Sequence, residues 1–164
     1  GLVMEQKITK ISYANEITLI TLSTLPGGKT VSQILTAFAA QGINVDMISQ
    51  TAPQGGSVRL SFTVSDRDLG VVLTLLGQLS GKENNLSPEI LPGNSKIAFY
   101  DAGMVNTPGV AAKVFSLLSE ASIQIMLVTT SDVDISILVS AHDLGEALGV
   151  MRKGFGVEPE EVHF

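Results

Sequence analysis

Apolar and polar positions alternate along the chain in a pattern that occurs twice. Residues 17–27 and 96–109 each show the partial alternation of a strand that ends in a Pro-Gly turn. A helical pattern follows each turn, because apolar residues recur three and four positions apart. These residues are Val31, Ile34, Leu35 and Phe38 in the first helix and Ala111, Val114, Phe115 and Leu118 in the second. The repeat predicts two copies of one structural unit.

The remainder of each copy also matches. Strands are predicted at residues 43–50 and 123–130, and a further strand follows in each copy, centred on Phe62 and on Ile137. A second helix begins near Leu69 in the first copy and near Leu144 in the second, and a short last strand is predicted at residues 88–92 and 158–164. Both copies therefore follow the order strand, helix, strand, strand, helix, strand (βαββαβ). This is the ferredoxin-like unit, in which two helices cover one face of an antiparallel sheet.

The predicted fold class is therefore α+β, with one module at residues 15–93 and a second at residues 94–164. Residues 1–14 are interpreted as a linker with an extra edge strand, and the linker between the modules is placed at residues 81–87 or 92–95. Each module has a size at which a single core is only marginally adequate. We therefore expect the uncovered surface of each module to be buried against another module.

Composition excludes several classes of partner. The 164 residues include 16 acidic and 10 basic residues, for a formal net charge of −6, and the basic residues do not cluster, so no nucleic acid is expected to bind. No apolar run approaches the roughly 20 residues of a membrane-spanning helix, so no membrane partner is expected. Cysteine is absent, which fits a reducing compartment, and we expect the protein to be cytoplasmic.

Residues with catalytic chemistry are scarce. His142 and His163 are the only histidines, and they are expected to be surface or structural residues. No histidine pair has metal-ligand spacing, and no nucleophile lies in a motif with a base. The run 26–31 is similar to the end of a phosphate-binding loop, but Ser23 occupies the position of its first glycine. We therefore predict no catalytic site, no metal site and no cofactor in this chain.

Helix starts are the more informative feature, because their unpaired N–H groups and positive dipole favour a carboxylate. In the second copy, Pro108 presets the first helical turn, and Gly109 would let a ligand approach the backbone. A free amino acid could place its carboxylate there. A capped helix without a ligand remains an equally good interpretation of these residues alone.

Three segments carry a resemblance to a known family. They are INVDMISQ at residues 43–50, the run 101–115 with its GMVNTPGVAAK stretch, and the run 128–139 with its TTSD stretch. Together they resemble the tandem ACT region of aspartate kinases, over about residues 7–157. The resemblance implies two ACT modules that regulate a kinase domain outside this chain, where ATP and Mg²⁺ would bind and aspartate would be phosphorylated.

The resemblance also implies effector-binding residues. The loop residues Asn106, Thr107, Gly109, Val110 and Ala111 would hold the carboxylate and amino group of an amino acid. The facing strand would contribute Asn44, Val45 and Asp46, with Asp46 as the partner of a lysine ammonium. The rim of the other interface site would include Gln50, Gln124 and Ile125. A solvated edge position remains the alternative for Asp46.

Three departures from the family pattern lead us to expect one kind of site. The first loop is two residues longer than the second and has Thr24 where many relatives have an acid, and Met126 occupies the position that matches Asp46. The implied function is allosteric feedback inhibition by lysine or, second, threonine, in a homodimer formed by ACT pairing. A stand-alone double-ACT sensor, a dimerisation module without effector, and an enzyme on the same fold remain alternatives.

Overall fold

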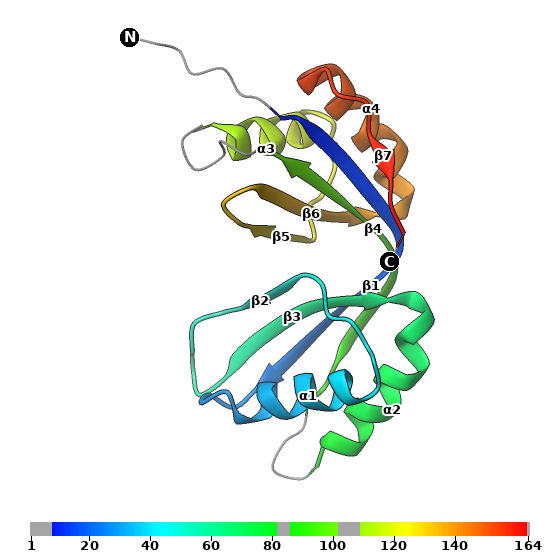
Figure 1. Ribbon diagram of the computed structural model, residues 1–164. Helices are drawn as coiled ribbons and strands as arrows, with labels where there is room; N and C mark the ends of the chain where they lie inside the picture. Colours follow the sequence, from blue (N-terminus) through cyan, green and yellow to red (C-terminus); the bar gives the residue numbers. More distant parts are fainter. Residues whose placement is uncertain (1–7, 82–85, 102–108, 164) are drawn as a thin grey trace. The chain divides into compact units, whose positions relative to one another are not determined.

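The computed structural model describes residues 8–81, 86–101 and 109–163, and the chain divides into two compact units. One unit, here called the insert unit, comprises residues Glu16–Gly93. The other, here called the flanking unit, comprises Gly1–Asn15 together with Asn94–Phe164. Each unit contains one copy of the predicted repeat (Figure 1).

The insert unit is a sheet with two helices on one face (Figure 1). Its strands lie in the order β2-β3-β1-β4, and β1 and β3 are antiparallel with Ile20 opposite Phe62. The elements are β1 (Lys10–Thr24, from Glu16 onward), α1 (Lys29–Ala40), β2 (Ile48–Gln50), β3 (Val58–Ser65), a 3₁₀ turn (Asp66–Asp68), α2 (Leu69–Leu79) and the start of β4 (Glu89–Tyr100).

The flanking unit repeats this arrangement with one extra strand segment. Its strands lie in the order β5-β6-β4-β1, and β7 pairs in parallel with β1. Antiparallel β4 and β6 place Ile97 opposite Ile137, which matches the Ile20–Phe62 pair of the insert unit. Besides parts of β1 and β4, the elements are α3 (Val110–Glu120), β5 (Leu127–Thr130), β6 (Asp134–Ser140), a 3₁₀ turn (Ala141–Asp143), α4 (Leu144–Phe155) and β7 (Glu160–Glu161).

Each unit has its own hydrophobic core between its sheet and its helices. In the insert unit, Ile34 and Phe38 of α1 pack with Phe62 of β3. The two phenylalanine rings are arranged edge to face, with their centroids 5.7 Å apart. In the flanking unit, Val114 and Leu118 of α3 occupy the corresponding core positions. These pairs confirm the repeat predicted from the helical spacing, and the mixed fold with antiparallel pairing confirms the predicted fold class.

The structure differs from the predicted boundaries at the N-terminus. Residues 1–14 were interpreted as a linker with an edge strand, but Ile8 and Ile11 lie in the core of the flanking unit. The β1 residues Ser12 and Tyr13 pair with β7, and β1 also neighbours β4, so residues 10–15 are an internal strand of that unit. Burial of the two isoleucines explains why the segment belongs to the sheet.

The candidate linker at residues 92–95 lies inside β4. Both β1 and β4 continue from one unit into the other, and each has a left-handed residue at the boundary, Glu16 with φ 59° and Gly93 with φ 74°. A left-handed conformation is readily adopted by glycine and costs other residues roughly 1–2 kcal/mol. The boundary between the units is therefore set by local backbone geometry within two long strands.

The strands predicted at residues 43–50 and 123–130 are shorter in the structure, where only Ile48–Gln50 and Leu127–Thr130 form ladders. Before β2, the Met47 N–H donates to the Thr63 side-chain Oγ1 at 2.9 Å, which replaces one regular ladder bond. The preceding residues connect to the end of α1, where the N–H of Ile43 donates to the Phe38 carbonyl.

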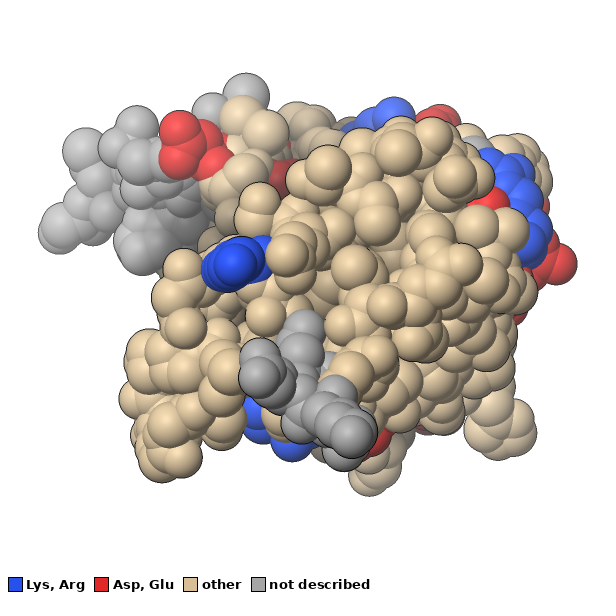
Figure 2. Space-filling view, turned by 90° about the horizontal axis from the view of Figure 1, so that it is seen from below, with Lys and Arg blue, Asp and Glu red and all other residues tan. Residues whose placement is uncertain are grey.

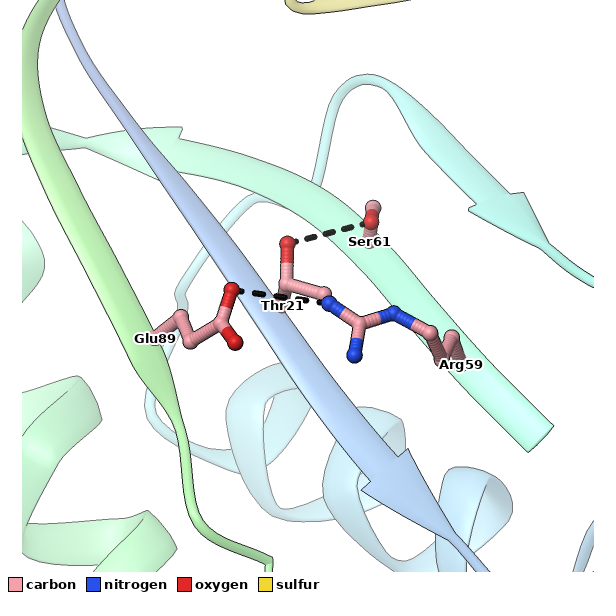
Figure 3. Close-up of polar contacts among 4 residues, drawn as sticks. All are labelled: Thr21, Arg59, Ser61 and Glu89. Carbon is pink, nitrogen blue, oxygen red and sulfur yellow. Dashed lines mark hydrogen bonds and ion pairs between the residues drawn. The ribbon is translucent and has the colours of Figure 1, made fainter. Parts of the chain in front are cut away.

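The face of the insert-unit sheet away from its helices is polar (Figure 3). The hydroxyl groups of Thr21 and Ser61 form a hydrogen bond of 3.1 Å. A guanidinium nitrogen of Arg59 on β3 lies 3.5 Å from a carboxylate oxygen of Glu89 on β4. Both members of the ion pair are more than half exposed, so the pair contributes little to stability. Over the described part of the chain, no helix is long and apolar enough to cross a membrane.

Candidate functional site

The first helix of each unit begins with the same backbone geometry. Gly28 precedes α1 with φ 77°, and Gly109 precedes α3 with φ 95°; within the part of the chain that the structure describes, neither helix has a side-chain hydrogen bond at its cap. The carbonyls of both glycines accept the first helical hydrogen bond at 2.9 Å, from Ser32 and Lys113 respectively. First-turn N–H groups have no partner within a helix, so both helix starts are suited to a carboxylate.

The segment that follows each helix is also repeated. The Asp46 N–H donates to the Thr63 carbonyl at 3.1 Å, and the Met126 N–H donates to the Leu138 carbonyl at 2.8 Å. Since Thr63 and Leu138 are equivalent positions in β3 and β6, these bonds make Asp46 and Met126 structural equivalents. Only the insert unit therefore carries an acid at this position.

The structure places the predicted residues in two groups. Asn44, Asp46 and Gln50 are exposed on the insert unit, where Val45 packs partly against the core. On the flanking unit, Gly109, Ala111 and Gln124 are exposed, and Ile125 packs partly against the core. The predicted loop residues Asn106 and Thr107 lie outside the described residues.

Val110, which is predicted to bind the effector, is buried in the structure. Its side chain is 2% exposed and belongs to the core of the flanking unit. Only its backbone could therefore contact a ligand at the start of α3. The helical spacing from Val110 to Val114 and Leu118 is the sequence signal for this burial.

The structure buries two polar residues that lie outside the predicted site. Thr24 and Asp101 each lie two positions after a core residue, Leu22 and Phe99, so they are equivalent in the two units. Both are at most 5% exposed, and the Thr24 hydroxyl has no hydrogen-bond partner among the described residues. A polar residue at an inward position of an alternating strand is the signal that could have identified them.

Both histidines of the chain lie on the surface. His142 is exposed in the 3₁₀ turn before α4, where its N–H donates to the Ser140 hydroxyl, and His163 is exposed as well. Among the described residues, no three His, Cys, Asp or Glu side chains form a group that could hold a metal ion.

Comparison with known proteins gives the family. Residues 97–155 match the family model of the ACT domain. The aspartokinase of Bacillus sp. (strain MGA3) is 30% identical over 164 residues, an alignment that covers 94% of this chain and 40% of that protein. The chain thus spans about two fifths of the length of the curated relative.

Two solved structures match almost from end to end. The ligand-free regulatory subunit of aspartate kinase from Thermus thermophilus has a TM-score of 0.84 at 25% identity, covering 92% of this chain and 99% of that one. A structure of aspartokinase alpha and beta subunits gives a TM-score of 0.82 at 29% identity, covering 92% of this chain and 100% of the matched chain. The chain is therefore an ACT regulatory region of the aspartokinase kind.

Proposed function

We propose that this chain binds an end-product amino acid and thereby controls an aspartate kinase by allosteric feedback inhibition. Lysine is the first candidate effector and threonine the second. The observation that carries the proposal is the start of α3, where left-handed Gly109 precedes a helix that has no side-chain cap among the described residues. The backbone there can receive a carboxylate without any dedicated side chain.

Asp46 supports lysine as the effector. It is the exposed acid after α1, and its structural equivalent in the other unit is the uncharged Met126. A carboxylate and an ammonium form a charge-assisted hydrogen bond, which contributes about 1.5–3 kcal/mol. We propose that a flanking unit of one copy supplies Gly109 and Ala111, that an insert unit of its partner copy supplies Asp46, and that Gln50, Gln124 and Ile125 lie at the rim of the other interface site.

Regulation follows if the effector favours one arrangement of the paired copies. A ligand shifts an equilibrium only by its difference in affinity for the two states, and allosteric coupling is typically about 1–3 kcal/mol. The kinase domain would bind ATP and Mg²⁺ and would be the partner that changes activity. A separate regulatory subunit is the second candidate, because the Thermus thermophilus subunit is matched over 99% of its length.

Lysine is expected to raise the thermal unfolding midpoint of the chain, because a ligand that binds only the folded state stabilises it by about 2.7 kcal/mol at a hundredfold excess over Kd. Asp46→Ala is expected to raise the lysine Kd by about tenfold or more, the equivalent of at least 1.4 kcal/mol. A thermal unfolding scan measures the midpoint and a calorimetric titration measures the Kd, with Glu146→Ala as a control that removes an exposed carboxylate from α4.

Three results would change the proposal. If threonine alone stabilises the chain, the sensor remains and the site moves toward Gln50 and Gln124. If lysine binds equally well to the Asp46→Ala protein, Asp46 does not contact the ammonium group. If neither amino acid changes the unfolding midpoint, the chain is a pairing module without an effector.

A further inference from the structure

Two residues of the insert unit lie opposite a single residue just before β2 begins. The N–H of Asp46 donates to the Thr63 carbonyl at 3.1 Å, and the N–H of Thr63 donates to the Met47 carbonyl at 3.0 Å. The remaining N–H, that of Met47, donates to the Thr63 side-chain Oγ1 at 2.9 Å. Asp46 and Met47 therefore share Thr63 as their partner on β3, which is the arrangement of a β-bulge.

The bulge decides which way Asp46 faces. Ile48 pairs with Phe62, so an uninterrupted ladder would put Asp46 opposite Val64. Val64 is 2% exposed and lies in the core of the insert unit, where an ionised carboxylate would lose its hydration. The extra residue instead brings Val45 to the core-facing position, where it packs partly against the core, and leaves Asp46 exposed.

The flanking unit has the same bulge without the hydroxyl group. There the Met126 N–H donates to the Leu138 carbonyl at 2.8 Å, and Leu127 pairs with Leu138 in the ladder. A leucine side chain cannot accept a hydrogen bond, whereas a threonine hydroxyl can. The unit that carries the acid Asp46 is therefore also the unit that carries a side-chain acceptor at the bulge.

The Thr63 hydroxyl lies where water does not replace it. Thr63 is 1% exposed and Met47 is 2% exposed. A buried N–H without an acceptor is unfavourable, so loss of the hydroxyl would destabilise the bulge relative to other pairings of this segment. Asp46 directly precedes Met47, and its carboxylate would then sample several directions. The hydroxyl of Thr63 thus fixes the direction of the carboxylate.

The helices of the insert unit supply no substitute for Asp46. Neither α1 nor α2 contains an acidic residue, and Lys29 at the start of α1 is their only charged residue. Seen from below the view of Figure 1, a broad area carries neither acidic nor basic side chains (Figure 2). Exposed charges are screened beyond about 8 Å at physiological ionic strength, so a ligand ammonium group needs a carboxylate held close to it.

We propose that Thr63 is a positioning residue for Asp46, and that its hydroxyl gives the effector site its preference for a basic amino acid. The inference rests on the proposed function, in which the Asp46 carboxylate binds the ammonium group of the ligand. Thr63 acts through the backbone of Met47 and Asp46. The preference is a difference between two affinities, that for lysine and that for an uncharged amino acid of the same length.

Calorimetric titration of the full chain with lysine and with norleucine, which is lysine without its side-chain ammonium group, tests the inference. Thr63→Val keeps the shape of the side chain and removes the hydroxyl. The lysine Kd is expected to rise about fivefold, equivalent to about 1 kcal/mol, whereas the norleucine Kd should stay unchanged. Thr63→Ser keeps the hydroxyl and is expected to bind lysine like the unmodified chain.

Thr21→Val is the matched control, because it removes a hydroxyl from the same face of the same sheet. The Thr21 hydroxyl is hydrogen-bonded to Ser61 at 3.1 Å (Figure 3), and β1 is separated from β2 by β3. Lysine should bind this variant as it binds the unmodified chain. In the Asp46→Ala background, Thr63→Val should cause no further loss of lysine affinity, because a positioning residue acts only through the group that it positions.

Hydrogen exchange of the unmodified chain tests the inference without any substitution. Saturating lysine should slow exchange of the Met47 amide more than that of Gln54, whose N–H donates to the Ser57 carbonyl at the end of the β2–β3 hairpin. Equal slowing of the two amides would overturn the inference. So would a folded Thr63→Val protein that binds lysine like the unmodified chain, or one whose affinities for lysine and norleucine fall together.

Failure of the proposed function gives a different result. The unmodified chain would then bind no lysine, or the Asp46→Ala chain would bind lysine equally well, and the role of Thr63 would fall with that of Asp46. Lysine binding that depends on Asp46 but not on Thr63 would overturn the role of Thr63 alone.

Discussion

Phe38→Ala is expected to lower the free energy of unfolding of the insert unit by about 3–5 kcal/mol. Phe38 is 0% exposed and connects α1 to the sheet through its edge-to-face contact with Phe62. Truncation removes that contact and leaves a cavity that close-packed neighbours fill only partly. Because whole domains are stable by about 5–15 kcal/mol, the loss is a large fraction of the total.

Native-state hydrogen exchange is the measurement for this variant, because it resolves the two units separately. Amides of β3 should lose protection in Phe38→Ala, and amides of β6 should lose less. Thr36→Ala, on the exposed side of the same helix, serves as the control and should change stability by no more than about 0.5 kcal/mol. A Phe38→Ala loss as small as that of Thr36→Ala would contradict the assigned core.

Ile11→Ala is expected to destabilise the flanking unit by about 2–5 kcal/mol, although Ile11 is far from most of that unit in sequence. Its side chain is 0% exposed and packs in one cluster with Phe99, Val114 and Ile137. The substitution therefore tests whether the first part of β1 is a structural strand of this unit.

The same exchange experiment distinguishes the outcomes for Ile11→Ala. The amides of β6 should lose the most protection from exchange, whereas the amides of β3 in the insert unit should retain more of theirs. The exposed neighbour Lys10 makes a matched control, since Lys10→Ala removes only a cation–π contact with Tyr100, at 5.6 Å, that contributes about 0.5–1 kcal/mol. An unchanged flanking unit in Ile11→Ala would mean that residues 8–15 are a dispensable linker.

The repeated fold could be predicted because its signal is local. Alternation around Phe62 and Ile137 reports which face of a strand is buried, and the spacing from Ile34 to Phe38 reports the buried side of a helix. Each of these patterns lies within a dozen residues, so neither depends on knowing the partner strand.

Strand partners could not be predicted in the same way. The sequence near Ile11 indicates a strand, but its neighbours β4 and β7 lie about 80 to 150 residues away in the chain, and alternation does not name a partner. The short β2 and β5 have a similar explanation, since the N–H groups of Asp46 and Met126 donate to the carbonyls of Thr63 and Leu138, one position out of the ladder register. A shift of this kind leaves no periodic trace in the sequence.

The candidate site was predicted unevenly for the same reason. Gly109 was selected from its Pro-Gly turn, and the structure gives it the left-handed conformation that a glycine adopts without strain. Asp46 came from the resemblance to aspartate kinases, because an exposed acid on an extended segment has no distinguishing local pattern. Thr24 was singled out only as a departure from the family pattern, and its burial was not predicted because an inward strand position is normally apolar.

The path of β1 and β4 through both units imposes an order on folding during synthesis. Residues 16–93 are contiguous, so the insert unit has all of its strands once residue 93 has left the ribosome. The flanking unit needs residues 10–15 at one end and β7 at the other, so its first strand must wait for about 150 residues to be made. At roughly 5–20 residues per second, Ile8 and Ile11 remain without their core for about 7–30 seconds. Residues 8–15 are therefore the part of this region that chaperones would have most time to bind.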